Sequence, residues 1–500
     1  MVTYVEFLCG LVTLAVAFYY YLIWNYDFWK KRGVPGPEPR LFFGTQKDLL
    51  LAKVTAADIV EDACAKYRSA PVVGLYACRS PILVVQDPEL IKTVLIRDFP
   101  KFIDRPHKTH ERAEPTTLNL FNLDPETWRL LRAKQSPMFA TGRLKGMFNL
   151  MLKCSEKLEK YLDYLVSKNE IVEIRGLTTK FATDVIGSCA FGIDTNTLCP
   201  EDTEFYRMSK LITGYSFERT LRFKLRVFLP WFYDLLGYVW PENTLAPFFT
   251  KIVMETISYR KKNNIHRPDF IQNLMELRDS PKNPGDMEFS DKMLMAQCAA
   301  FFGAGLDTVS STMNWALLEL AMNHDIQEKL RQEIKEYIKK YKGEITYETM
   351  KEMVYMDKVF QETLRKYAIA PVAIRTSVCD YDFEGLNFSI PKSTEIWVPI
   401  YALHRDPDIY PNPEIFDPER FNKEAVAARH PMHYIPFGSG PRNCIGGRVA
   451  IFETKLSLLK ILSRYKVDVC KQTKLPYEYD SKAINLVYKG NLYLKMTAIK

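Results

Sequence analysis

The stretch FGSGPRNCIG (residues 437–446) places glycines, an arginine and a single cysteine within ten residues. Gly438 and Gly440 permit positive φ angles and a close approach of the backbone to a flat or bulky group. A dinucleotide-binding fingerprint would need glycine where Asn443 stands, and the sequence offers no partner ligands for a zinc site. A lone thiolate at Cys444, among exposed backbone amides, suits one axial bond to an iron atom. The alternative, a buried structural cysteine in a turn, does not explain the phenylalanine and arginine at fixed offsets.

The bulk composition is that of a large protein with an ample apolar core. The chain has 500 residues, of which 47% are hydrophobic, and a formal net charge of +8. This mildly basic balance is compatible with an acidic partner or an anionic membrane surface, and we expect no nucleic-acid partner. The ten cysteines form no CxxC pair, which indicates a reducing compartment.

The N-terminus predicts a membrane anchor. Residues 7–24 (FLCGLVTLAVAFYYYLIW) carry no charge, and the first basic residues, at 30–32, follow this run. That order favours an uncleaved signal anchor over the alternative of a cleaved signal peptide, and it keeps the rest of the chain cytosolic. We therefore expect a transmembrane segment at 1–29, a basic and proline-rich hinge at 30–40 that acts as a stiff spacer, and a catalytic domain at 41–500.

A second apolar stretch, VFLPWFY (227–233), follows Arg222, Lys224 and Arg226. It has two interpretations of about equal weight. One is a core loop, and the other is a segment that dips into the membrane interface with its basic residues at lipid headgroups.

The periodicity between residues 40 and 500 is mainly helical. Long helical patterns occupy 291–323, 325–341 and 353–367, and short β-like runs occupy 81–87, 393–401, 484–490 and 491–496. No repeat interrupts them. The predicted fold class is mainly α with small β-sheets, in a single large domain.

The decapeptide resembles the haem-binding loop of the cytochrome P450 family, whose pattern is F-x-x-G-x-R-x-C-x-G. All specified positions match, at Phe437, Gly440, Arg442, Cys444 and Gly446. Other family signatures follow in order along nearly the whole chain. The resemblance implies haem b (iron protoporphyrin IX) as cofactor, with Cys444 as the axial ligand of the iron and Phe437 beside the haem.

A second motif, AGLDT (304–308), lies inside the first long helical pattern. Gly303, Gly305 and Thr308 are expected to weaken the helix ladder and open a groove, with the Thr308 hydroxyl bonded to a carbonyl one turn back. The alternative is a kink with a satisfied threonine. The resemblance implies that Asp307 and Thr308 deliver protons for oxygen activation.

Two further groups of residues contain arginines. Glu362 and Arg365 are three apart on a helix and form an ion pair there; with Arg420 they resemble the buried Glu–Arg–Arg core of the family, a structural role. Trp128 and Arg132 share a helix face that suits an anion, and the resemblance implies that they hold a haem propionate. The resemblance adds further propionate contacts at Arg375 and Arg442.

Together these features resemble the insect microsomal, detoxification-type branch of the family. The implied activity is a monooxygenase that inserts one atom of dioxygen into a lipophilic small molecule: a xenobiotic, plant toxin, insecticide, or endogenous lipid or hormone. The resemblance places the pocket at Phe121, Phe302, Ala304, Val372, Ile374 and Leu486, all apolar or small.

The implied partners are NADPH–cytochrome P450 reductase, with cytochrome b5 as an optional second donor, and membrane lipids. The basic residues expected on the cysteine side would receive an acidic partner, or form an ordinary solvated face: Arg129, Lys134, Arg143 and Lys145. The implied location is the endoplasmic reticulum membrane, with the catalytic domain on the cytosolic face. Two alternatives remain: a haem–thiolate isomerase or hydroperoxide-cleaving enzyme, and a non-catalytic haem-binding sensor or carrier.

Overall fold

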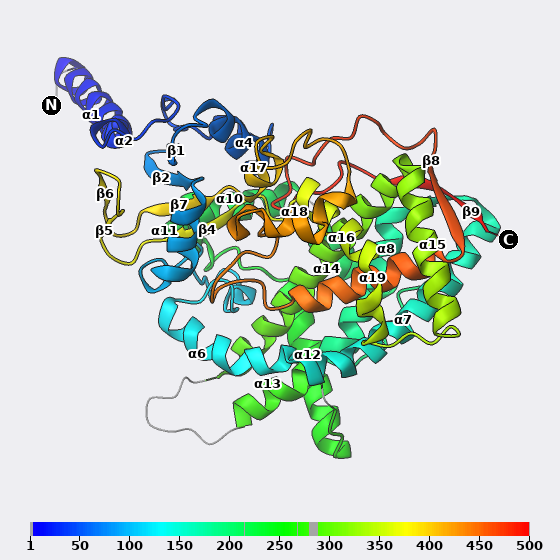
Figure 1. Cartoon of the computed structure of the whole chain (residues 1–500). Helices are drawn as coiled ribbons and strands as arrows, with labels where there is room; N and C mark the ends of the chain where they lie inside the picture. Colours follow the sequence, from blue (N-terminus) through cyan, green and yellow to red (C-terminus); the bar gives the residue numbers. More distant parts are fainter. Residues whose placement is uncertain (1–3, 215, 268, 280–288, 500) are drawn as a thin grey trace. The chain divides into compact units, whose positions relative to one another are not determined.

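The computed structural model describes residues 4–214, 216–267, 269–279 and 289–499. Over these residues the chain is mostly helical with small β-sheets, which confirms the predicted fold class (Figure 1). It divides into two compact units, each built from three stretches of chain, so the predicted domain at 41–500 contributes to both. Unit 1 comprises Met1–Pro106, Ala370–Ile409 and His430–Arg442, and unit 2 comprises His107–Ile369, Tyr410–Arg429 and Asn443–Lys500.

Unit 1 is built around a four-stranded sheet of order β1-β2-β7-β4. Its strands are β1 (Val72–Ala77), β2 (Ser80–Val85), β7 (Glu395–Val398) and β4 (Ala373–Thr376), and a small hairpin adds β5 (Tyr381–Asp382) and β6 (Ser389–Ile390). β2 and β7 are parallel, and the other neighbours are antiparallel. The helices of this unit are α1 (Tyr4–Ile23), α2 (Phe28–Lys31), α3 (Lys47–Leu50), α4 (Ala56–Lys66), α5 (Pro88–Lys92) and α17 (Ile400–Arg405).

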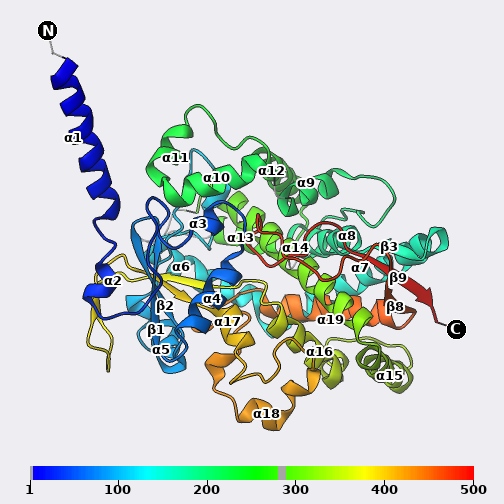
Figure 2. The same ribbon diagram turned by 90° about the horizontal axis from the view of Figure 1, so that it is seen from above.

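The N-terminal helix is exposed, whereas the segment after it is packed against the sheet. α1 extends away from the sheet of its unit (Figure 2), and its apolar side chains are exposed along its length. Trp29 in α2, by contrast, is buried and donates from Nε1 to the carbonyl of Leu75 at 2.9 Å. The carbonyl of Pro35 accepts from the Gly74 amide at 2.8 Å. The start of the hinge at 30–40, expected to be a spacer, is therefore packed on β1.

Unit 2 is a helical body with a three-stranded sheet of order β3-β9-β8. The strands are β3 (Ile171–Glu173), β9 (Tyr493–Ala498) and β8 (Tyr465–Val469). The helices are α6 (Pro125–Gln135), α7 (Thr141–Lys168), α8 (Ile174–Ile186), α9 (Glu204–Thr213), α10 (Phe217–Phe228), α11 (Pro230–Leu236), α12 (Leu245–Asn263), α13 (Phe270–Asp279), α14 (Asp291–Met322), α15 (His324–Lys340), α16 (Val354–Lys366), α18 (Lys423–Ala427) and α19 (Gly447–Leu462).

α14 is the central helix of unit 2. Ser290 caps its first turn by accepting from the Met293 amide at 3.2 Å. The helix is apolar almost all round, and it contacts α8, α12, α16 and α19 (Figure 1). A helix of that composition needs neighbours on every side, which is why most of its residues are buried.

The predicted long helices are confirmed as α14, α15 and α16, and the runs at 81–87 and 491–496 as β2 and β9. Two expectations were only partly right. β7 ends at Val398, and Ile400 already begins α17. The run at 484–490 forms a single β-bridge, between Tyr488 and Tyr479, because its backbone turns to meet other segments of unit 2.

The stretch 227–233 forms the end of α10 and the start of α11. Its residues Val227, Leu229 and Trp231 are exposed, so the core-loop interpretation is wrong for them. Arg226 is ion paired with Glu114 at 3.0 Å, and both side chains are partly buried.

Candidate functional site

The cysteine loop is shaped by its glycines. Gly438 and Gly440 have φ angles of +70° and +74°, so the predicted positive φ is confirmed. A Cβ at Gly440 would lie 1.8 Å from the carbonyl oxygen of Leu95, a contact that no side chain can make. The close approach required at this glycine is therefore to the backbone of unit 1. Phe437 and Arg442 belong to unit 1, whereas Cys444 belongs to unit 2.

Cys444 differs from nearly every other cysteine in its exposure. All ten cysteines lie in the described residues and none forms a disulfide; only Cys9, in the apolar α1, and Cys444 are exposed. Burial raises the pKa of the thiols of Cys64 and Cys154 to about 12. Those cysteines stay protonated and inert, while the sulfur of Cys444 is accessible to a metal. A Cβ at Gly446 would meet nothing within 4 Å, so the chain leaves open space just after the cysteine.

Arg132 on α6 lies beside this cysteine within unit 2. Its Nη2 donates to Asn443 Oδ1 at 2.9 Å. Burial lowers the pKa of the Arg132 guanidinium, and the negative charge of Cys444 opposes that shift. Trp128, one turn earlier on α6, is buried. A positively charged guanidinium thus lies beside Cys444, and the thiolate is the form of cysteine that binds iron.

Among the buried arginines of unit 1, Arg375 and Arg442 carry neighbouring charges. Burial and the neighbouring charge of Arg442 lower the pKa of Arg375 to about 10. The Nε atoms of both arginines are buried without a hydrogen-bond partner among the residues that the structure describes. Arg375 Nη1 donates to the carbonyl of Ile374 at 2.9 Å, and no carboxylate of the described chain pairs with Arg375. A buried guanidinium such as that of Arg375 fits an anionic group that the polypeptide does not supply.

Asp307 and Thr308 lie in the middle of α14. The Thr308 hydroxyl donates to the carbonyl of Ala304 at 2.7 Å, as the sequence predicted. The helix is nonetheless continuous from Asp291 to Met322, so the expected weakening of its ladder does not appear as a break. Asp307 is buried, and its Oδ2 accepts from Asn485 Nδ2 at 2.7 Å.

Glu362, Arg365 and Arg420 meet in the core of unit 2. Arg365 makes a bidentate contact with Glu362 at 2.7 and 2.8 Å, and both side chains are fully buried. Arg420 Nε lies 3.5 Å from Glu362 Oε1, and the amide of Asp417 donates to the same oxygen at 2.9 Å. Burial raises the pKa of the Glu362 carboxyl, while the hydrogen bonds from Arg365 act in the opposite direction. The cluster fixes the 412–420 segment against α16.

The pocket candidates of unit 2 fall into two groups. Phe121 and Ala304 are exposed. Phe302 and Leu486 have almost no exposed surface; Phe302 packs against Phe249 with ring centroids 5.4 Å apart. In unit 1, the partly buried Val372 and Ile374 pack against the core of the β1-β2-β7-β4 sheet.

Sequence reasoning missed Asn443 and Asn485. Asn443 occupies one of the unspecified positions of the decapeptide, so no pattern singles it out. Asn485 is 178 residues from Asp307 in the sequence, and nothing in the local sequence connects the two.

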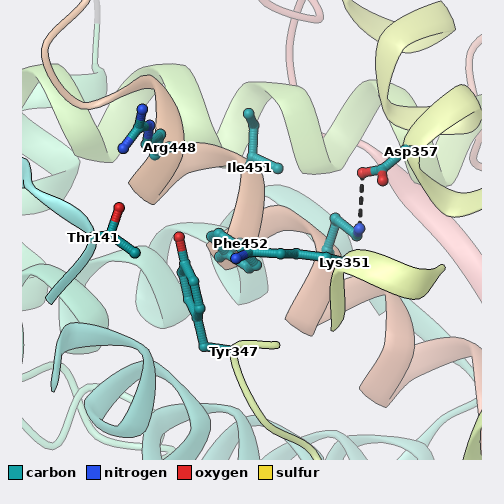
Figure 3. A pocket seen from close by; sticks show the side chains of 8 residues that line it. Thr141, Tyr347, Lys351, Asp357, Arg448, Ile451 and Phe452 are labelled. Atoms are coloured by element: carbon teal, nitrogen blue, oxygen red, sulfur yellow. Dashed lines mark hydrogen bonds and ion pairs between the residues drawn. The ribbon is translucent and has the colours of Figure 1, made fainter. Parts of the chain in front are cut away.

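A basic recess of about 390 Å³ lies between the start of α7 and α19 (Figure 3). Lys351, Arg448 and Lys455 contribute cationic groups to it, and Asp357 the carboxylate. Lys455 donates to Asp357 at 2.8 Å, and Lys351 to Glu348 at 2.9 Å. Arg448 has no ion pair within the described part of the chain. None of the predicted pocket residues lines this recess.

Comparison with known proteins gives a consistent result. The family model described as "Cytochrome P450" matches residues 34–495. Among curated relatives, "Cytochrome P450 6a2" of Drosophila melanogaster is 38% identical over 489 residues, covering 95% of this chain and 96% of that protein. "Cytochrome P450 6A1" of Musca domestica is 36% identical over 505 residues, with 99% and 98% coverage. "Cytochrome P450 6k1" of Blattella germanica is 35% identical, with 98% and 97% coverage.

The site and these matches define a haem–thiolate monooxygenase. The chain belongs to the cytochrome P450 family, and its relatives include insect members, as the resemblance predicted. Haem is the cofactor of this family. The residues of unit 2 fit it, with an exposed thiol at Cys444 beside the Arg132 guanidinium. Within unit 1, the buried Arg375 has no carboxylate partner among the described residues.

Proposed function

We propose that the protein inserts one atom of dioxygen into a lipophilic small molecule, with Cys444 as the thiolate ligand of the haem iron. The observation that carries this proposal is the exposure of Cys444 beside the Arg132 guanidinium. Arg132 and Trp128 would hold one haem propionate. Arg375 and Arg442 would bind propionate through their buried guanidiniums, with Phe437 beside the ring.

When bound, haem supplies the iron at which dioxygen takes up two electrons, so that one oxygen atom enters the substrate and the other leaves as water. That reaction consumes two protons. Asp307 is the carboxyl group in the middle of α14 that can take up and release protons, and Thr308 offers a hydroxyl next to it. We assign proton delivery to this pair.

The substrate pocket would use the candidates with exposed surface in unit 2, Phe121 and Ala304. Val372 and Ile374 are proposed as further contacts. Phe302 and Leu486 are packed so completely that they would support the pocket from behind. An aromatic ring and small aliphatic groups favour an apolar substrate, of xenobiotic or endogenous origin.

Electrons would come one at a time from NADPH–cytochrome P450 reductase, with cytochrome b5 as an optional donor. Arg129, Lys134 and Arg143 are exposed and have no ion pair among the described residues; Lys145 is paired with Glu348 at 2.6 Å. We propose that they and the recess at Arg448 receive an acidic partner.

The N-terminal helix would anchor the protein in the endoplasmic reticulum membrane, with the catalytic part in the cytosol. α1 contains an apolar window, Glu6–Ile23, with mean hydropathy 1.7 and no buried residue. The exposed Val227, Leu229 and Trp231 would add a second, weaker contact with lipid. We retain the boundaries 1–29, 30–40 and 41–500 for this function.

The test is reconstitution with reductase and a panel of plant toxins, insecticides, fatty acids and steroids. The proposal predicts NADPH oxidation that depends on an added lipophilic compound and yields an oxygenated product. Turnover without reductase and dioxygen would instead identify an isomerase or hydroperoxide-cleaving enzyme. Binding without any turnover would identify a sensor or carrier.

A further inference from the structure

The carboxylate of Asp307 is held by a side chain from a distant part of unit 2. Asn485 Nδ2 donates to Asp307 Oδ2 at 2.7 Å, a short distance for an amide donor, as expected for a bond to a carboxylate. The acceptor has only oxygens to offer, so the amide must present its nitrogen. The contact brings the loop before β9 onto the middle of α14.

The loop that carries Asn485 is fixed by its own backbone. The amide of Asp480 donates to Val487 at 3.0 Å, and that of Lys489 to Glu478 at 2.9 Å, so residues 478–489 close into a hairpin. Asn485 lies within this hairpin, next to its best-anchored residue, Leu486.

Leu486 is bonded through both of its backbone groups. Its amide donates to the carbonyl of Ile369 at 2.9 Å, and its carbonyl accepts from Trp315 Nε1 at 2.9 Å. Trp315 is stacked on Tyr367, with ring centroids 4.1 Å apart. It also lies eight residues beyond Asp307 on α14, about 12 Å along the helix. One helix therefore carries both the carboxyl group and the anchor of the loop that binds it.

The chemistry of the donor suits proton delivery. The amide of Asn485 carries no charge, so this hydrogen bond adds no positive charge beside Asp307. The hydrogen bond holds one carboxylate oxygen in place. A carboxyl group held in one orientation loses less entropy when it transfers a proton.

We propose that Asn485 is a positioning residue for proton delivery, acting through the Asp307 carboxylate. This inference rests on the proposed role of Asp307. It assigns to Leu486 the function of anchoring the loop, which explains why that residue is buried.

The experiment compares Asn485→Ala and Asn485→Asp in the full-length holoenzyme, with Asn491→Ala as the control. Asn491 lies on the same segment, but its amide contacts Tyr493 at 3.4 Å and not α14. The two Asn485 variants should bind haem and substrate as the wild type does. Their turnover should fall about three- to tenfold at unchanged KM, because a misplaced carboxyl group loses only part of the roughly 10²–10⁴-fold that general acid–base catalysis contributes, and the solvent isotope effect should rise. The control variant Asn491→Ala should have the turnover and the solvent isotope effect of the wild type.

A double-mutant cycle separates positioning from a general structural effect. In the Asp307→Asn background, Asn485→Ala should cause no further fall in turnover, because its effect passes through the carboxylate. Hydrogen exchange is the readout that does not depend on activity. The Leu486 amide should stay protected in Asn485→Ala, since its bond to Ile369 is intact.

Four results would overturn the inference. One is wild-type turnover and isotope effect in both Asn485 variants, while Asp307→Asn is slow; the proposed function then survives. Another is a fall in turnover on Asn485→Ala that is as large in the Asp307→Asn background as in the wild type. Loss of hydrogen-exchange protection at the Leu486 amide is a further one, and either result would indicate a purely structural role. Wild-type turnover in Asp307→Asn would overturn the proton role of Asp307 and this inference with it.

Discussion

Among the residues that the structure describes, two helices have the length and hydropathy to cross a membrane, and they have opposite environments. The apolar window of α1 has mean hydropathy 1.7 and no buried residue, whereas the corresponding window of α14 has mean hydropathy 1.2 and 67% of its residues are buried. The difference lies in their polar residues. In α14, Asn314 accepts from Thr178 at 2.8 Å, and Glu319 is ion paired with Lys366 at 2.6 Å. Polar side chains with specific partners mark a core helix, and their scarcity marks a helix that suits lipid.

The same charge placed in both helices is the strongest test of this contrast. Leu317 in α14 has no exposed surface, and Leu14 in α1 is 69% exposed. Leu317→Arg should abolish folding, because an unpaired buried charge costs more than about 4–5 kcal/mol, comparable with the whole stability of many domains, about 5–15 kcal/mol. Leu14→Arg should leave haem incorporation intact. The measurement is the haem content of each variant after expression; a haem-loaded Leu317→Arg protein would contradict the assignment of α14 as core.

Truncation should separate the membrane helix from the packed segment behind it. Deleting residues 1–23 should release most of the protein from membranes and preserve haem binding. Deleting residues 1–29 also removes Trp29, whose indole is buried against β1, so this shorter form should be less stable by about 3–5 kcal/mol. Membrane fractionation and urea unfolding report the two effects. Equal stability of the two truncated forms would show that the hinge is a free spacer after all.

Within α14, Thr308→Ala tests whether the hydroxyl has a role in proton delivery. The variant should keep haem, substrate binding and NADPH oxidation. Product formed per NADPH should fall several-fold, with hydrogen peroxide released instead, since general acid catalysis contributes about 10²–10⁴-fold in rate. Peroxide and product are measured together in one reconstituted assay. Unchanged coupling would leave Thr308 as a residue that only satisfies the Ala304 carbonyl.

The smallest effect is expected at the apolar surface of α10 and α11. Trp231→Ser should reduce the residual membrane affinity of the protein lacking residues 1–23 about two- to fivefold, an effect of an exposed aromatic ring on interfacial binding. Tyr259→Ser on α12 is the matched control, because both rings are exposed, by 69% and 63%. Vesicle co-sedimentation is the measurement. The same loss in both variants would remove the lipid-facing role of Trp231.

The sequence alone was sufficient to predict structural features that depend on one short segment. The positive φ angles of Gly438 and Gly440 and the hydroxyl bond of Thr308 were predictable, because each follows from local geometry. The burial of Trp29 was not, since it depends on a strand some 45 residues further along the chain. Asn485 was equally out of reach: its partner is set by the path of a loop that only tertiary contacts determine.

The central claim is that Cys444 ligates the haem iron, and the carbon monoxide difference spectrum of the reduced protein tests it most directly. The account predicts the strongly red-shifted Soret band of thiolate ligation in the wild type and in Cys9→Ser, the other exposed cysteine. Cys444→His should bind haem without that band. An unchanged red-shifted band in Cys444→His would contradict the claim.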